Sequence, residues 1–88
     1  MRRVVCEAVG EIDQLVVVDG EAPAPRPGQV IVDVAAAGVN FVDGLFVQGR
    51  YQIKPPTPFT PGSEIAGTVA TLGDGVEGVA VGDRVMAQ

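Results

Sequence analysis

The placement of glycine and proline constrains this chain more than any other feature. Twelve glycines and seven prolines divide the 88 residues into short segments. Glycine interrupts regular structure by its backbone freedom, and proline does so by its fixed φ and missing donor. Between these breaks, valine and alanine recur at the two-residue period of a strand. Strands are predicted over residues 2–9, 14–20, 29–37 and 65–72, with a last strand starting at Arg84.

One short helix is predicted after Gly38. Asn40 is a favoured N-cap, and Asp43 follows three residues later in the first turn, where a negative charge is stabilising. Gly49 is the expected helix end. The apolar residues of this segment are expected to hold the helix against the rest of the domain, namely Phe41 and Leu45, with Val42 and Phe46 as further candidates.

Two proline-rich segments are predicted to lack regular structure. Residues 21–28 have three alternating prolines, which favours a stiff, extended connector over a partner-binding motif. Residues 51–62 contain the other four prolines and are predicted to form a loop. A loop of this length in a small domain is usually functional or ordered by a partner.

These elements together predict the class of fold. Many short strands, frequent glycine turns and one or two short helices indicate a mainly β protein, arranged as a partly open β-barrel of antiparallel strands over residues 1–88. Closing or nearly closing such a barrel would protect the edges of strands that are rich in valine.

Charge and length exclude several kinds of partner. The net charge is −5, whereas binding nucleic acid requires clustered Lys and Arg to neutralise phosphates. No apolar run approaches the roughly 20 residues that span a bilayer, and acids occur too early in MRRVVCEAVGEID for a secretory signal. We therefore expect a cytoplasmic protein that binds neither nucleic acid nor membrane. The lone Cys6 agrees, because it cannot form an internal disulfide.

The absence of histidine excludes much site chemistry. A chain with no histidine and one cysteine cannot assemble a Ser/His/Asp or Cys/His triad, nor the Cys and His ligand sets of zinc sites. Cys6 is expected to be a small core residue and not a nucleophile. The segment GDGVEGVAVGD lacks a following helix, so its glycines are predicted to form turns and not a phosphate-binding loop.

Four segments, taken in order, indicate a family. PRPGQVIVDVAAAGVNFVD, FTPGSEIAGTV, LGDGV and VGDRV resemble the N-terminal GroES-like catalytic domain of the medium-chain dehydrogenase/reductase superfamily. The resemblance covers essentially the whole chain. It is nearest to the zinc-independent quinone oxidoreductases of the zeta-crystallin type, and so implies hydride transfer from NADPH to a quinone or related enone.

The resemblance also implies a site without metal. Zinc-dependent relatives carry a cysteine ligand where this chain has Asn40 and a histidine ligand where it has Ser63. An amide and a hydroxyl are poor substitutes for those ligands on zinc. Glu64 matches the acid that follows the second ligand, and here we expect it to be a structural hydrogen-bonding group.

By the same resemblance, Asn40 is implied as a catalytic and cofactor-binding residue near the nicotinamide of NADPH, a role that can coexist with helix capping. Tyr51 is implied to contact cofactor or quinone, although a tyrosine beside such a loop can also serve packing alone. Phe41, Leu45 and Tyr51 would line the substrate cleft. Close quinone reductases often have a tyrosine at the position of Leu45 and an arginine at the position of Val47. These two differences leave open whether the acceptor is a quinone or an enoyl compound.

The family binds NADPH mainly through a following Rossmann domain, which the sequence does not contain. We therefore expect the 88 residues to be a fragment that is inactive alone, with uncovered apolar residues such as Phe41, Leu45 and Phe59 that favour self-association into homo-oligomers. Two alternatives remain at this point. One is a stand-alone GroES-like assembly module, and the other is an enoyl reductase segment of a polyketide synthase.

Overall fold

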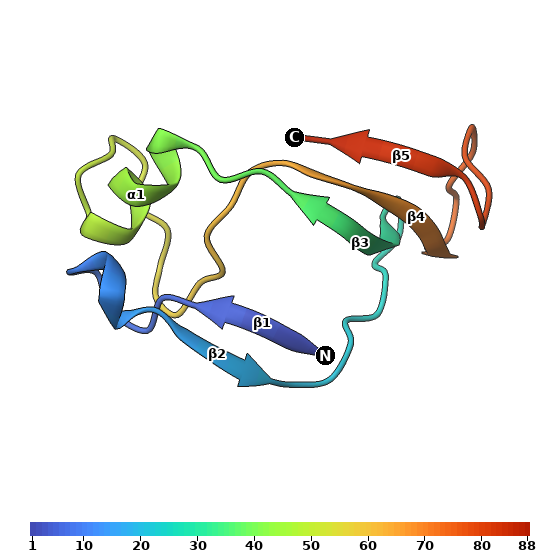
Figure 1. The fold of residues 1–88 in the computed structure, drawn as a ribbon. Helices are drawn as coiled ribbons and strands as arrows, with labels where there is room; N and C mark the ends of the chain where they lie inside the picture. The colour runs from blue at the N-terminus through green and yellow to red at the C-terminus, as the bar shows by residue number, and fades with distance from the viewer. The chain divides into compact units, whose positions relative to one another are not determined.

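The computed structural model describes all 88 residues, Met1 to Gln88. The chain forms two compact units: Met1–Glu21 with Val39–Ser63, and Ala22–Gly38 with Glu64–Gln88. Each unit contains its own antiparallel sheet, of two strands in the first and three in the second (Figure 1). The mainly β class with one short α-helix is confirmed. The strands form open sheets, so the closed form of barrel considered from the sequence is not present.

The first unit is built on a hairpin. Strand β1 (Arg2–Val5) pairs antiparallel with β2 (Val16–Asp19), and a strand was predicted in each place. The 3₁₀ helix η1 (Ile12–Gln14) lies in the connection between them. Strand β1 is shorter than predicted, and the alternation of faces breaks at its end, because Val5 and Cys6 are both buried.

Helix α1 (Phe41–Gln48) occupies the predicted place in the first unit. Its C-cap Gly49 has φ of 70°, the left-handed conformation that glycine adopts without a steric penalty. Asp43 and Val47, one turn apart on the same face, are its buried residues. Phe41 is 86% exposed, so the prediction that Phe41 holds the helix against the domain was wrong. No helix in the structure has the length and apolar character needed to cross a bilayer.

The proline-rich loop of the first unit is anchored at one point. Phe59 forms an isolated antiparallel bridge with Cys6, in the stretch predicted to be irregular. The rest of residues 50–63 has no helix or strand, so the predicted loop is confirmed. A second backbone contact, from the Gly10 N–H to the Val47 carbonyl at 3.0 Å, ties the segment after β1 to the end of α1.

The second unit is a three-stranded antiparallel sheet in the order β3–β4–β5, formed by β3 (Val30–Ala37), β4 (Ile65–Leu72) and β5 (Arg84–Ala87). All three strands were predicted. Two register shifts in β3, between Ile31 and Val32 and between Val34 and Ala36, interrupt its predicted strict alternation.

The central strand β4 carries the core of the second unit. Val69 is 1% exposed, and Gly67, two residues earlier on the same face, is also buried. A Cβ at Gly67 would overlap the Asp33 carbonyl oxygen of β3. The glycine therefore permits close approach of the two backbones. Beyond β4, no helix follows the glycine-rich segment and Gly75, Gly78 and Gly82 have positive φ, in agreement with the predicted turns.

Candidate functional site

Asn40 is the N-cap of α1, as predicted, and its backbone is held by Asp43. The Asn40 N–H donates to Asp43 Oδ2 at 2.8 Å, and the Asp43 N–H donates to the Asn40 carbonyl oxygen at 3.0 Å. The two residues form the pattern of a capping box, but the Asn40 carboxamide itself makes no capping hydrogen bond. Because Asn40 is exposed, its carboxamide is available to a ligand.

Asp43 is the buried polar residue of the structure, with 8% of its surface exposed. While Oδ2 accepts from Asn40, the Oδ1 atom is buried and has no hydrogen-bond partner. Sequence reasoning placed Asp43 correctly in the first turn and missed its burial. The available signal was the four-residue spacing from the apolar Val47, which puts both side chains on one helix face.

The other predicted site residues lie on or next to α1. Phe41 is the first helical residue and is largely exposed, whereas Leu45 and Tyr51 are half-buried. The Tyr51 ring packs against Phe46, with ring centroids 4.8 Å apart and planes at 48°. Asn40, Phe41, Leu45 and Tyr51 therefore belong to one short stretch of the first unit.

Val47 and Leu45, the two positions where the resemblance implies an arginine and a tyrosine in close quinone reductases, differ in burial. Val47 is 2% exposed and belongs to the core. Position 47 is therefore buried in this chain, whereas Leu45 remains half-exposed. Of the two departures, Leu45 is the one that can alter the surface presented to a ligand.

Ser63 and Glu64 fall on either side of the division between the two units. Ser63 is exposed and belongs to the first unit, and Glu64 belongs to the second. The Gly38 N–H donates to the Glu64 carbonyl oxygen at 3.2 Å, and the Glu64 side chain occupies the space where a Cβ on Gly38 would lie. The hydrogen bond of Glu64 to Gly38 is therefore made by its backbone carbonyl, whereas its carboxylate packs against Gly38.

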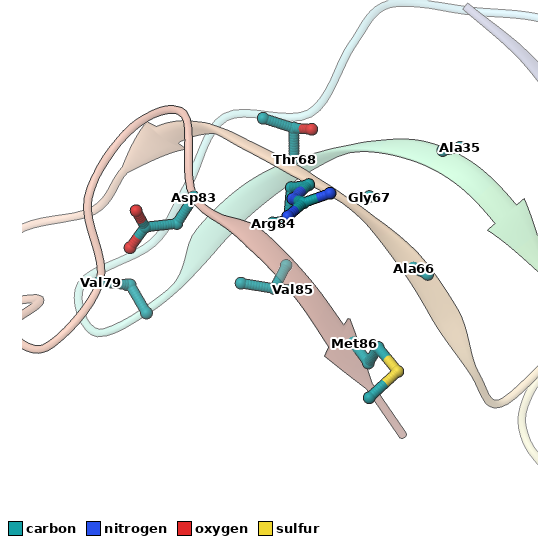
Figure 2. A pocket seen from close by; sticks show the side chains of 9 residues that line it. All are labelled: Ala35, Ala66, Gly67, Thr68, Val79, Asp83, Arg84, Val85 and Met86. Atoms are coloured by element: carbon teal, nitrogen blue, oxygen red, sulfur yellow. The ribbon is translucent and has the colours of Figure 1, made fainter.

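A hollow on the second unit contains none of the predicted site residues. Figure 2 shows its lining, which comes from β3, β4, β5 and the loop before β5. Its volume is about 770 Å³. Arg84 and Asp83 are the charged residues there, beside apolar groups such as Val85 and Met86. Met86 is 88% exposed, so this hollow is a shallow depression on an open sheet.

No group of three or more His, Cys, Asp or Glu side chains is placed to hold a metal ion. At the two positions where the resemblance implies zinc ligands in metal-dependent relatives, this chain has an amide and a hydroxyl, Asn40 and Ser63.

Residues 26–88 match the alcohol dehydrogenase GroES-like domain family. The chain therefore belongs to this family, which confirms the resemblance to the medium-chain dehydrogenase/reductase proteins. Quinone oxidoreductases are among its relatives. One is the rat quinone oxidoreductase-like protein 2, which is 47% identical over 77 residues, 86% of this chain and 22% of that protein.

A second relative is the human synaptic vesicle membrane protein VAT-1 homolog-like, with 41% identity over 99% of this chain and 21% of that protein. The chain thus spans about a fifth of the length of the curated relatives it matches. The crystal structure of the human VAT-1 homolog-like protein matches with a TM-score of 0.93 over 98% of this chain and 28% of that chain.

Two further solved structures bear on ligands. A mycobacterial protein complexed with NADPH is 37% identical, with a TM-score of 0.90 over 98% of this chain and 27% of that chain. A thermostable alcohol dehydrogenase from Pyrobaculum aerophilum, with bound cobalt and zinc, is 42% identical. Its TM-score is 0.88, over 98% of this chain and 26% of that chain. Because a metal-bound protein matches as well as an NADPH complex, the fold alone does not distinguish the two branches.

Proposed function

We propose that this chain is part of an NADPH-dependent quinone oxidoreductase, which transfers a hydride from NADPH to a quinone or related enone without zinc. The observation that carries the proposal is the exposed carboxamide of Asn40, which is left without a capping hydrogen bond at the start of α1. Relatives named as quinone oxidoreductases and a similar protein complexed with NADPH support it.

The residues of the first unit suit the nicotinamide end of NADPH. Asn40 offers a donor and an acceptor, while Phe41, Leu45 and Tyr51 offer apolar surface beside it. The chain has no glycine-rich loop that opens a helix, which is the usual cradle for phosphates. We therefore assign the phosphates of NADPH to a Rossmann domain outside these 88 residues, in line with the fraction of each relative that the chain spans.

When bound, NADPH supplies a hydride, which together with one proton from solvent converts a quinone to a hydroquinone. The negative charge that develops on the quinone oxygen is spread over the ring, so a strong Lewis acid is not required. The Asn40 Nδ2–H donates to that oxygen and stabilises the charge. The apolar side chains of Phe41 and Leu45 hold the acceptor and exclude water.

The donor set supports the assignment to a zinc-independent enzyme. An amide at Asn40 and a hydroxyl at Ser63 have low affinity for zinc compared with the thiolate and imidazole of metal-dependent relatives. The chain also contains no histidine that might replace them.

The acceptor is tested by assay of the polypeptide that the complete gene encodes. NADPH oxidation is measured with benzoquinone and, separately, with an enoyl thioester. We expect turnover with benzoquinone and a loss of about tenfold in kcat/KM for Asn40→Ala, the effect of about 1.4 kcal/mol from one hydrogen bond. Turnover of the enoyl thioester alone would assign the protein to the enoyl reductases, as the departure at Leu45 allows. No oxidation of NADPH with either acceptor would refute the proposal.

A further inference from the structure

The two carboxylate oxygens of Asp43 are used unequally. Oδ2 accepts the Asn40 N–H at 2.8 Å, which accounts for an acid in the first turn. Oδ1 is buried and accepts nothing. A buried carboxylate oxygen without a donor is costly, because it loses its hydration without compensation. Helix capping therefore explains one half of this side chain and leaves the other half unexplained.

A group that could supply the missing donor belongs to the same pair of residues. The Asn40 carboxamide has two N–H hydrogens on Nδ2 and makes no capping hydrogen bond. The Asn40 backbone is already fixed to Asp43 through two hydrogen bonds, so the Asn40 side chain is the candidate donor that, by rotation, would bring Nδ2 toward Oδ1. One N–H would then meet the carboxylate, and the other would remain for a ligand.

We infer that Asp43 is a positioning residue for Asn40: Oδ2 fixes the backbone, and Oδ1 accepts one N–H of the carboxamide so that the second N–H points to the oxygen of the hydride acceptor. This inference rests on the proposed function. A charge-assisted hydrogen bond to the carboxylate is stronger than a neutral one and restricts the rotation of the amide.

The variant that separates positioning from capping is Asp43→Asn. Its side-chain oxygen can still accept the Asn40 N–H, so the helix start is retained. Its second atom becomes an NH₂ donor, which cannot accept from the Asn40 carboxamide. The matched control is Asp33→Asn, which removes the same charge from an exposed position on β3.

We expect Asp43→Asn in the complete polypeptide to lower kcat with benzoquinone about tenfold, with the KM for NADPH changed less than about twofold. The thermal unfolding midpoint should stay close to that of the wild type, and Asp33→Asn should match the wild type in kcat. Unchanged kcat in Asp43→Asn would overturn the inference while the proposed function stood.

A second measurement is independent of activity and of the stability of any one variant. Asn40 is the only asparagine in these 88 residues, and its side-chain NH₂ signals in a ¹⁵N spectrum are assigned by their loss in Asn40→Gln. We expect one of the two Asn40 side-chain protons in the wild type to be shifted downfield and to exchange slowly with solvent. Two protons with the shifts and exchange of a free amide would overturn the inference, even if no quinone reduction were found.

Discussion

Cys6 and Phe59 exchange two backbone hydrogen bonds, from the Cys6 N–H to the Phe59 carbonyl at 2.8 Å and from the Phe59 N–H to the Cys6 carbonyl at 3.1 Å. This bridge fixes the proline-rich loop to the end of β1. It also encloses Cys6, which is 1% exposed. The loop is thus held by a contact within the first unit, and no partner is needed to place Phe59.

The first prediction concerns access to the Cys6 thiol. Because Cys6 is buried beside the bridge, a thiol reagent such as dithionitrobenzoate should modify it far more slowly in the folded chain than in guanidinium chloride. The rate of thionitrobenzoate release measures this. Equal rates in the folded and denatured chain would mean that the bridge opens readily.

The second prediction compares two glycines at α1. Gly49→Ala should destabilise the fold by about 1 kcal/mol, because the residue has φ of 70°. Gly44→Ala should stabilise it by about 0.5–1 kcal/mol, since the position is within the helix and a new Cβ would meet only Ile12 Cδ1 at 3.5 Å. Urea unfolding measures both, and a stabilising Gly49→Ala would contradict the observed helix end.

The third prediction separates a ligand surface from the core. Phe41→Ala should change the free energy of unfolding by less than about 0.5 kcal/mol, because Phe41 is 86% exposed, yet it should raise the KM for benzoquinone. Val47→Ala should cost about 1–3 kcal/mol, because Val47 is 2% exposed. If Phe41→Ala left KM unchanged, Phe41 would not belong to the acceptor site.

The fourth prediction addresses the metal. The complete polypeptide, purified and dialysed against EDTA, should reduce benzoquinone at the same rate as before dialysis, and elemental analysis should find less than stoichiometric zinc. The reason is the amide and hydroxyl at Asn40 and Ser63. A parallel dialysis of a zinc-dependent alcohol dehydrogenase, with loss of its activity, verifies the chelation. Zinc bound one per chain, with activity lost on its removal, would contradict the prediction.

Local sequence signals predicted much of this structure. The alternation in β4 placed Gly67 and Val69 on one face, and both are buried. Asn40, Asp43 and Gly49 fixed both ends of α1, because capping depends on residues close in sequence. The shifts in β3 were not predicted, since a bulge is decided by pairing with β4 and not by the strand's own pattern.

Contacts between distant residues could not be predicted. The Cys6–Phe59 bridge joins segments more than fifty residues apart, and nothing in either segment specifies the other. Phe41 was misplaced because hydrophobicity was taken as burial, whereas the helix turns its Asp43 and Val47 face inward. The candidate site was identified largely through family resemblance, and its unpaired carboxylate oxygen became visible only in three dimensions.

The start of α1 is secured by bonds to the main chain of residue 40, through its N–H and its carbonyl. Formation of the helix start consequently depends little on which side chain residue 40 carries. A single codon change can then exchange the reactive group at this position, from a metal-binding thiolate to a neutral amide, while the scaffold that presents it stays the same. New chemistry in such a fold can arise without rebuilding its architecture.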